Sequence, residues 1–463
     1  MKRFKTMIAM AVVFVPLLLF SQVAQKPPMG WNSFDSYGVY LYDQVANRLV
    51  EKMAEVYKPF GYEYFVIDAG WFGEFELYPG TMIAKEKHAE KVNINEYGIL
   101  QPSHCYFPNG FRELIDKTHR LGLKFGLHLM RGISREAVRR NTIVKGTNYR
   151  AQDIADTTSI CTWCLQNWGV NMDKPGAQAY YDSIIEELAN WGVDFIKYDD
   201  IVPFPKEVEA VSKAIAKCGR PIVLSLSPGG SVDINAIDFF RKGNMLRVTN
   251  DVWDVQKDIN VCFASWRKWQ GKEQPGFWID MDMIPFGQLQ LMSPSPETLA
   301  KIVPGKSVAK PESKTSALYA GKGFTRRCAL NKNQMFTFIT MRALAASPLM
   351  IGGDLLTMDD FAIRLLTDKE MIECNQNGVM GHLIYEKDGV EIWNTPKEKS
   401  NNGWIGIFNR NQEKNVSLKL TSKEIGLDDK TSYNLYDIWG GKPFSLSLSH
   451  EIEPNGVIFI KYF

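Results

Sequence analysis

Acidic residues stand at the ends of short apolar runs for which the sequence predicts β-strands. Asp199 follows the run Asp194–Tyr198, and Asp251 follows the run Met245–Thr249. Side chains at the carboxyl ends of parallel barrel strands face a common site. Two carboxyl groups about 5 to 5.5 Å apart cleave a glycosidic bond with retention, one as nucleophile and the other as acid/base. We therefore predict that Asp199 is the nucleophile and Asp251 the acid/base of a retaining glycoside hydrolysis.

Basic residues accompany both carboxylates. Lys197 lies two residues before Asp199, so the two side chains share one face of the strand. A neighbouring cation lowers the pKa of a carboxyl group and keeps a nucleophile ionised. Arg247 lies four residues before Asp251. An acid/base differs from a nucleophile in that it needs a pKa raised by burial or by a like charge. Asp68 ends another apolar run, and we expect it at the same face of the barrel.

Other interpretations of these acidic residues stay open. A single Asp after a strand commonly caps the next helix, which would account for Asp200 and Asp254. Oxygen ligands also suit a divalent metal ion, which would be held by Asp68, Asp199 and Asp251. Lys197 would compete with such an ion. A catalytically inactive, sugar-binding barrel is a further alternative, although a binding protein does not need a paired acid and nucleophile.

The acidic residues belong to a chain that alternates short apolar runs with amphipathic stretches between Lys26 and Asp360. Strands that alternate with helices indicate βαβ units and a parallel sheet. About eight units favour an α/β fold of the closed (β/α)8 type, a TIM barrel. The expected strands are Met29–Phe34, Tyr64–Asp68, Lys124–Met130, Asp194–Tyr198, Ile222–Ser227, Met245–Thr249, Phe277–Ile279 and Leu349–Ile351. The expected helices include Tyr42–Tyr57, Phe111–Leu121, Ala177–Trp191, Pro205–Lys217, Val255–Trp269 and Gln334–Ala345.

From about Tyr385 the pattern changes to an alternation of period two, which predicts a small antiparallel β-sandwich. Its expected strands are Val390–Trp393, Gly403–Phe408, Asn415–Leu420, Tyr433–Asp437 and Val457–Tyr462. We therefore place the barrel at 25–380 and the β-domain at 381–463. Ser293–Lys322, with several Pro, Ser and Lys residues, is expected to be a long loop or an insertion.

Residues 1–24 have the features of a secretory signal peptide. Lys2, Arg3 and Lys5 precede an apolar run from Met7 to Phe20, which is short for a membrane span. We expect this segment to be cleaved, the protein to be exported to the periplasm or the medium, and no stable membrane anchor to remain.

Composition and two small motifs indicate which binding partners and cofactors are expected. A formal net charge of +2 offers no basic surface for nucleic acid. Cysteine is present in an odd number, seven, and the CxxC pair Cys161 and Cys164 is expected to form a local disulfide or two free thiols. Gly352-Gly353-Asp354 is expected to form a turn rather than a phosphate site.

At these same residues the chain resembles glycoside hydrolase family 27, the α-galactosidase (melibiase) family. The resemblance covers nearly the whole mature chain, in Pro27–Ser33, Tyr64–Trp71, Leu123–His128, Trp191–Asp199, Arg247–Asp251, Trp278–Met283 and Ala346–Gly352. The family architecture, a (β/α)8 barrel followed by an antiparallel β-domain, agrees with the pattern of strands and helices.

The resemblance implies roles position by position. Asp199 and Asp251 match the family nucleophile and acid/base, while Lys197 and Arg247 match residues that hold sugar hydroxyls. Asp68 matches the first of two adjacent acids that bind the far side of galactose. Further sugar contacts are expected from Trp31, Phe34, His128, Ser227 and Asp282. The resemblance implies no metal and no organic cofactor.

Departures from the family pattern fall in the specificity pocket. Ala69 stands where α-galactosidases carry a second Asp, and its side chain cannot accept a hydrogen bond from the axial 4-hydroxyl group of galactose. Phe34 and His128 stand where many members have Trp and Tyr, and Ser227 stands in the loop that reads the 2-substituent.

The expected substrate is an oligo- or polysaccharide with a terminal α-D-galactosyl group. β-L-Arabinopyranosides and isomaltosyl or dextran substrates are alternatives, because Ala69 changes the pocket. A homo-oligomer stays open.

Overall fold

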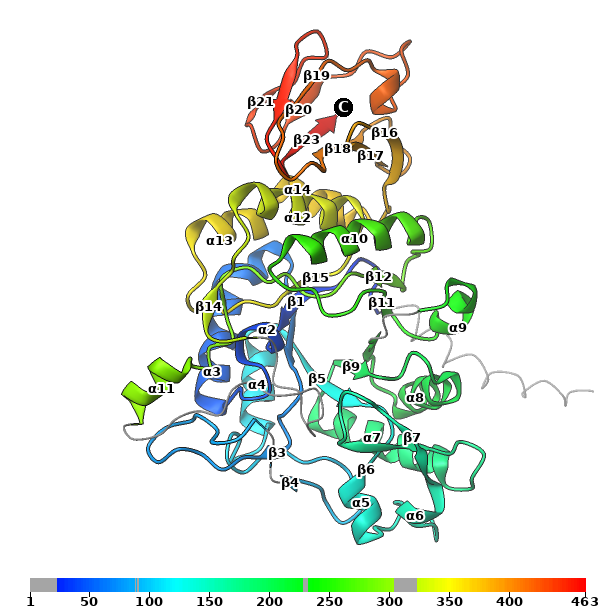
Figure 1. Cartoon of the computed structure of the whole chain (residues 1–463). Helices are drawn as coiled ribbons and strands as arrows, with labels where there is room; N and C mark the ends of the chain where they lie inside the picture. Colours follow the sequence, from blue (N-terminus) through cyan, green and yellow to red (C-terminus); the bar gives the residue numbers. More distant parts are fainter. Residues whose placement is uncertain (1–22, 88, 90, 228–231, 304–322) are drawn as a thin grey trace, which may run out of the picture.

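Eight parallel strands form the centre of the molecule (Figure 1). The computed structural model describes residues 23–463 except 88, 90, 228–231 and 304–322. In sheet order, the strands are β15 (Leu349–Ile351), β1 (Met29–Asn32), β2 (Tyr64–Ile67), β5 (Lys124–Met130), β9 (Phe195–Asp199), β10 (Val223–Leu226), β11 (Met245–Arg247) and β12 (Trp278–Asp280). All eight strands predicted from the sequence are confirmed, with ends that differ by at most two residues. The predicted signal peptide lies almost entirely outside the described residues, so it stays a prediction.

The first and last strands bring the two edges of this sheet together. β1 pairs with β15 in parallel, with Gly30 opposite Met350. Ile284, which follows β12, makes a parallel bridge to Ile351 of β15. The TIM-barrel fold predicted from the sequence is therefore confirmed, and the carboxyl ends of all eight strands point to one face.

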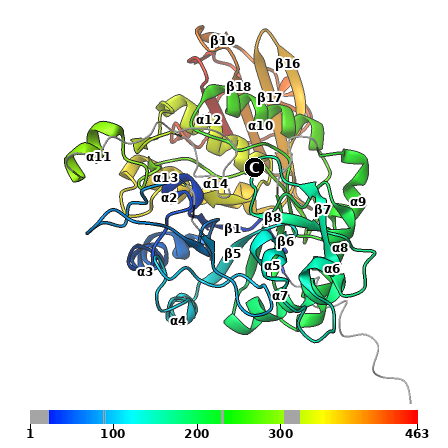
Figure 2. The ribbon, with the colours of Figure 1, turned by 60° about the horizontal axis from the view of Figure 1, so that its bottom comes forward.

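Helices connect successive strands and lie outside them, as the view in Figure 2 shows for α3, α4, α7 and α8. Those that join barrel strands include α3 (Asp43–Lys52), α4 (Arg112–Arg120), α7 (Ala177–Trp191), α8 (Pro205–Cys218), α10 (Gln256–Trp269) and α12 (Lys332–Leu344). Helices α7 and α8 end in glycine caps, where Gly192 and Gly219 adopt left-handed φ angles of 99° and 74°. Among the described helices, none combines the length and apolar character that a membrane span requires.

Two insertions depart from a plain barrel. After β5, the chain forms a three-stranded antiparallel sheet of β6 (Ile133–Ser134), β8 (Asn167–Val170) and β7 (Ala155–Ile160). The second is the segment Ser293–Lys322, predicted as a long loop or an insertion, which contains helix α11 (Pro296–Ile302) and is therefore not a plain loop. Ser295 caps this helix by accepting a hydrogen bond from the Thr298 backbone N–H at 3.2 Å, a signal that the loop prediction overlooked. The rest of this segment lies mostly outside the described residues.

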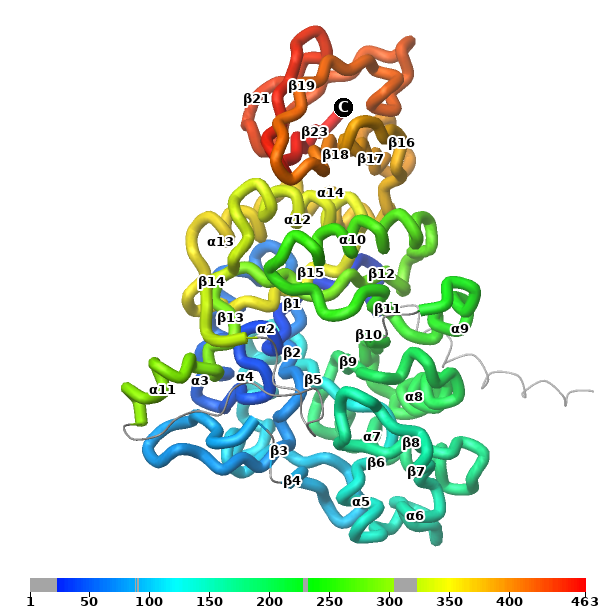
Figure 3. The backbone as a smooth tube through the Cα atoms, viewed as in Figure 1, coloured from blue at the N-terminus to red at the C-terminus, as the bar shows by residue number. Residues whose placement is uncertain are grey.

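The C-terminal part is an antiparallel β-domain, as the sequence predicts. Its larger sheet has the order β16 (His382–Lys387), β17 (Val390–Pro396), β18 (Gly403–Asn409), β23 (Val457–Tyr462), β20 (Leu435–Asp437) and β21 (Lys442–Pro443). A second sheet pairs β19 (Val416–Leu418) with β22 (His450–Ile452). The tube in Figure 3 shows this domain following α13 (Asp360–Leu366) and α14 (Lys369–Gln376). Strand β16 was not predicted.

The β-domain packs on the barrel through α10, α12 and α14, which lie between the two parts in Figure 1. Trp266 of α10 and Trp393 of β17 stack with ring centroids 3.7 Å apart and planes inclined by 18°. The Trp266 indole N–H also donates to the Gly381 carbonyl at 3.0 Å. Both rings are fully buried and belong to one hydrophobic core, which extends from the barrel into the β-domain.

Replacement of Trp393 by Ala tests how strongly the β-domain stabilises the barrel. Removing a fully buried Trp leaves a cavity, and we expect the free energy of unfolding to fall by about 3–5 kcal/mol. Tyr436→Ala on β20, where 37% of the residue is exposed, serves as the control, with a change within about 0.5 kcal/mol. Urea unfolding followed by circular dichroism measures both variants. Equal stabilities of the two variants would contradict this account of the junction.

Candidate active site

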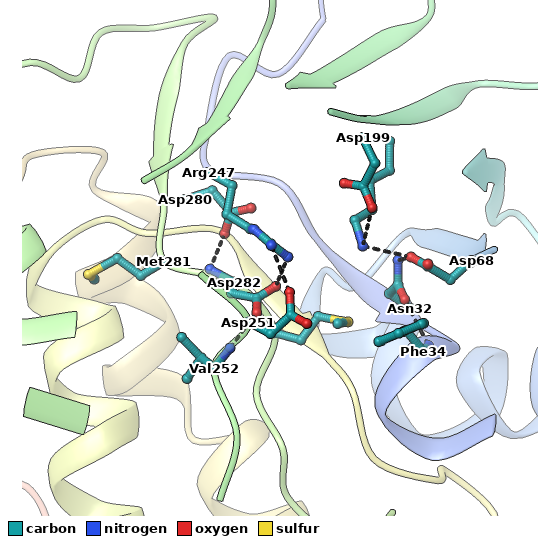
Figure 4. Close-up of polar contacts among 12 residues, drawn as sticks. Asn32, Phe34, Asp68, Asp199, Arg247, Asp251, Val252, Asp280, Met281 and Asp282 are labelled. Carbon is teal, nitrogen blue, oxygen red and sulfur yellow. Dashed lines mark hydrogen bonds and ion pairs between the residues drawn. The ribbon is translucent and has the colours of Figure 1, made fainter. Parts of the chain in front are cut away.

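Two groups of charged side chains face each other at the carboxyl ends of the barrel strands (Figure 4). The first group contains Asp68, which directly follows β2, and Lys197 and Asp199 of β9. The second comes from β11 and the loops after β11 and β12 and contains Arg247, Asp251 and Asp282. The structure therefore brings together carboxylates that are 183 residues apart in the chain, from Asp68 to Asp251.

Asp199 ends β9 and is surrounded by positive and hydrogen-bonding groups. His128 Nε2 lies 2.9 Å from Asp199 Oδ2, and Lys197 Nζ lies 4.0 Å from the same oxygen. Burial raises the pKa of Asp199, but Lys197 and His128 outweigh burial and hold that pKa well below its usual range. Asp199 is therefore a carboxylate at any pH near neutrality, as a nucleophile requires.

Asp68 has hydrogen bonds on both of its oxygen atoms. Its Oδ2 accepts from Lys197 Nζ at 2.8 Å and from Asn32 Nδ2 at 2.7 Å. Its Oδ1 accepts from the Ala69 backbone N–H at 2.8 Å. Burial raises the pKa of Asp68, whereas Lys197 and then His128 lower it, with a lowered pKa as the result. Lys197 is thus bound more closely by Asp68 than by Asp199.

Arg247 holds the second group together. Its Nη2 donates to Asp251 Oδ1 at 2.8 Å, and its Nη1 donates to Asp282 Oδ1 at 3.1 Å. The other oxygen of Asp282 accepts from the Val252 backbone N–H at 2.7 Å, so Asp282 also fixes the segment that carries Asp251. Asp282 adopts a left-handed φ of 75°, a conformation that costs a non-glycine residue energy and is retained where surrounding contacts require it.

Asp251 differs from Asp199 in exposure and in charge environment. Its side chain is 41% exposed, whereas that of Asp199 is 11% exposed. Desolvation raises the pKa of Asp251, Arg247 lowers it, and the like charge of Asp282 raises it, so that the pKa lies above its ordinary value. The two carboxyl groups therefore have pKa values displaced in opposite directions, the arrangement that separates an acid from a nucleophile.

Asn32 and Asp35 belong to the site but were not predicted from the sequence. Asn32 ends β1, and the rule that selected Asp68, a polar residue at a strand end, would have found it. Asp35 is buried, and its Oδ2 has no hydrogen-bond partner among the described residues. Burial, followed by the like charges of Asp282 and Asp251, raises the pKa of Asp35 well above its ordinary value.

The turn predicted at Gly352-Gly353-Asp354 makes room for this buried carboxyl group. A Cβ atom on Gly352 would lie 2.0 Å from Asp35 Oδ2, and one on Gly353 would lie 1.5 Å from the Phe286 carbonyl oxygen. Both distances are far below van der Waals contact, so the two positions require glycine because of close packing.

The remaining predicted residues lie at different depths. Phe34 is near the first group, with its ring 5.7 Å from Lys197 Nζ. Ser227 is buried, and its Oγ has no hydrogen-bond partner among the residues that the structure describes. Trp31 is not brought to the site: it is fully buried, stacks on Phe65 with ring centroids 4.9 Å apart and donates from its indole N–H to Gly353. The predicted sugar contact of Trp31 is therefore not supported by its position.

Asp200 and Asp254 are structural, but neither acts as the helix cap that the sequence suggested. Asp200 Oδ2 accepts from Arg131 Nε at 3.0 Å. Asp254 binds Arg326 through both oxygens, at 2.6 and 3.2 Å. A metal ion would need three or more suitable side chains, and no such group of His, Cys, Asp or Glu occurs within the described ranges. Lys197 stands beside Asp68 and Asp199 instead.

Comparisons with known proteins agree with this architecture. A family model described as "Alpha galactosidase A" matches residues 168–301, and one described as "Alpha galactosidase C-terminal beta sandwich domain" matches residues 387–462. Alpha-galactosidase 2 of Arabidopsis thaliana is 25% identical, over 95% of this chain and 90% of that protein. Alpha-galactosidase A of Cellvibrio japonicus is 24% identical, over 96% and 93%.

A solved structure is more similar still. The β-L-arabinopyranosidase of glycoside hydrolase family 27 from Geobacillus stearothermophilus is 35% identical, covers 96% of this chain and 97% of its own, and superimposes with a TM-score of 0.83. Barrel, β-domain and carboxylates at the strand ends together define a glycoside hydrolase. The chain belongs to glycoside hydrolase family 27, the α-galactosidase family.

Asp35→Asn tests the protonation of the buried carboxyl group. A raised pKa means that the folded protein holds this proton more tightly than the unfolded chain does. The contribution of the protonated group to stability is complete below the ordinary carboxyl pKa, and it is lost as pH rises towards the raised pKa. We expect the neutral Asn variant to gain stability relative to the wild type as pH increases from 5 to 8.

Urea unfolding at several pH values measures this difference, with Asp173→Asn as the control. The side chain of Asp173 is 75% exposed, and its replacement should give a difference that is small and independent of pH. A stability difference for Asp35→Asn that stays constant across this pH range would refute the proton assignment.

Proposed function

We propose that this glycoside hydrolase is a retaining exo-glycosidase in which Asp199 is the nucleophile and Asp251 the acid/base. The observation that carries the proposal is that the two carboxyl groups face each other at the ends of the barrel strands (Figure 4). The displacement of their pKa values in opposite directions, lowered for Asp199 and raised for Asp251, supports the assignment. Lys197 and Arg247, which accompany the two carboxyl groups, supply the positive charges of the site. The greater exposure of Asp251 suits a group that meets first a leaving oxygen and then a water molecule.

In this mechanism, Asp199 attacks the anomeric carbon as Asp251 protonates the departing oxygen. The bond to the leaving group breaks and an ester of Asp199 forms. Asp251, now a carboxylate, takes a proton from water, the water oxygen bonds to the anomeric carbon, and Asp199 leaves with its electron pair. Arg247 binds Asp251 at 2.8 Å, so it stabilises the carboxylate that the first step leaves behind.

We propose as glycone a terminal α-D-galactosyl group or the related β-L-arabinopyranosyl group, which is the same ring without the hydroxymethyl substituent. The relatives named α-galactosidase support the first, and the structure of the β-L-arabinopyranosidase supports the second. Asp68 supplies a carboxylate for the far side of the ring, and Ala69 beside it leaves that side without a second acceptor. Isomaltosyl and dextran substrates stay alternatives.

Azide rescue distinguishes the two catalytic roles. In Asp199→Ala, azide occupies the place of the lost carboxylate and attacks an activated dinitrophenyl glycoside directly, so we expect a glycosyl azide of inverted configuration. In Asp251→Ala, the ester still forms and azide replaces water, so the product keeps the configuration of the substrate. Without azide, loss of general acid–base catalysis should lower kcat for poor leaving groups about 10²- to 10⁴-fold.

Product configuration is read by nuclear magnetic resonance, and Asp173→Ala, at an exposed site, is the control that retains wild-type turnover. Full activity of Asp199→Ala, or the same azide configuration from both variants, would contradict the assignment.

A panel of nitrophenyl glycosides tests the glycone. We expect turnover of the α-D-galactopyranoside, the β-L-arabinopyranoside or both. Ala69→Asp restores a second acceptor, and one added hydrogen bond to a charged group should raise kcat/KM for the galactoside roughly 10-fold or more. Ala69→Val adds volume without an acceptor and should give no rise. Similar effects of the two substitutions would remove the basis for the role given to Ala69.

A further inference from the structure

His128 contacts the carboxylate of Asp199 rather than standing free in the pocket. It lies on β5 opposite Lys197 of β9, and its Nε2 is 2.9 Å from Asp199 Oδ2. The His128 side chain is 1% exposed. A short contact between two buried polar groups is strong, because water does not compete for either partner.

The direction of this hydrogen bond follows from the chemistry of its partners. A carboxylate oxygen only accepts, so the proton lies on Nε2 and His128 donates. Nδ1 of His128 is buried and has no hydrogen-bond partner among the described residues. Nδ1 therefore makes no hydrogen bond that competes with the one from Nε2. The charged groups around the ring are Asp199 and Lys197 from β9 and Asp68 from β2.

This geometry leaves the ring without a free polar atom for a sugar hydroxyl. Nε2 is bound to Asp199, and Nδ1 is enclosed by the protein. The sequence-based expectation that His128 contacts the substrate is therefore replaced by a contact with the reacting carboxylate itself.

We propose that His128 is a further catalytic residue, whose Nε2–H bond to Asp199 helps that carboxylate to leave in the second half of the reaction. The inference rests on the proposed function of Asp199. In that half-reaction, the bond between the anomeric carbon and an Asp199 oxygen breaks and its electron pair returns to the carboxylate. Water forms the new bond to carbon, and its proton goes to Asp251.

His128 favours this step because its acceptor changes charge. The Asp199 ester is neutral, whereas the departing carboxylate carries a full negative charge, and a hydrogen bond to a charged acceptor is about twice as strong as one to a neutral acceptor. The donor thus stabilises the product of deglycosylation more than its reactant. The same hydrogen bond also stabilises the free Asp199 carboxylate before it attacks. Loss of this bond should therefore slow deglycosylation more than glycosylation.

Two substitutions separate this role from a structural one. His128→Phe removes the donor and keeps a planar ring, while His128→Gln places an amide N–H near the former Nε2 position. With a dinitrophenyl glycoside of the glycone that the wild type prefers, we expect His128→Phe to lower kcat roughly 10- to 100-fold. KM should fall as well, with a burst of dinitrophenol equal to the enzyme concentration. His128→Gln should recover most of kcat and lose the burst.

Two outcomes would overturn the inference. A sugar contact predicts a raised KM and weaker binding of the free sugar by calorimetry, with no burst. A purely structural role predicts a lower melting temperature and an equal loss of kcat and kcat/KM.

A measurement on the wild-type protein keeps the test independent of folding. The enzyme is labelled with ¹⁵N-histidine, and a 2-deoxy-2-fluoro glycosyl reagent traps the ester. The Nε2–H proton of His128 should move upfield as its acceptor loses charge, and an unchanged resonance would contradict the proposal. Mass spectrometry of the labelled peptide identifies the trapped residue. If that residue is not Asp199, the proposed function fails, whereas an ester on Asp199 without the shift refutes only the role of His128.

Discussion

The buried negative charge of Asp199 is the constraint on which the site depends. A carboxylate taken out of water is costly unless cations and hydrogen-bond donors replace the lost hydration. Lys197 comes from the same strand face, and His128 comes from the neighbouring strand. Lys197 in turn needs its own partner, which Asp68 provides from β2. Three barrel strands must therefore be in correct register before Asp199 can be held as a carboxylate.

Asp251, the second carboxyl group, is in a different electrostatic environment. Asp251 shares Arg247 with Asp282, so one cation serves two acids. Burial and the Asp282 charge then raise the pKa of Asp251, although Arg247 lies only 2.8 Å away. Asp35 adds another buried acid nearby, with a raised pKa of its own. Acidic groups thus outnumber cations around Asp251, which favours a protonated carboxyl group there. Around Asp199, cations and hydrogen-bond donors predominate, which favours the ionised carboxylate.

Rigidity of the surroundings makes these shifts possible. Asp282 is bound at both oxygens, and Asp68 likewise. Helix α10, which follows the loop that carries Asp251, is joined to β17 by the stack of Trp266 on Trp393. Because side chains with fixed partners do not reorient when a neighbour changes charge, the electrostatic environment is set before substrate arrives, as preorganised catalysis requires.

Much of this arrangement was predictable from local sequence. The apolar runs and the intervening amphipathic stretches predicted all eight barrel strands, because burial on both faces leaves a continuous apolar signature. The rule that polar residues at the carboxyl ends of these runs line the site selected Asp68, Asp199 and Asp251. The same rule applied to β1 would have found Asn32. Edge and inserted elements were harder to predict. Strand β16 was missed, and α11 was missed although Ser295 provides an N-cap signal.

Sequence alone determined the order of strands, the alternation that puts Lys197 and Asp199 on one face, and the presence of an appended β-domain, because these depend on neighbours within a few residues. Tertiary structure decided which partner each polar group finds. In the folded protein, the Trp31 side chain is buried in the core, His128 contacts Asp199, and Asp35 packs against Gly352. Those pairings depend on register and packing between separate segments, such as those of His128 and Asp199, which are 71 residues apart. No local pattern encodes them.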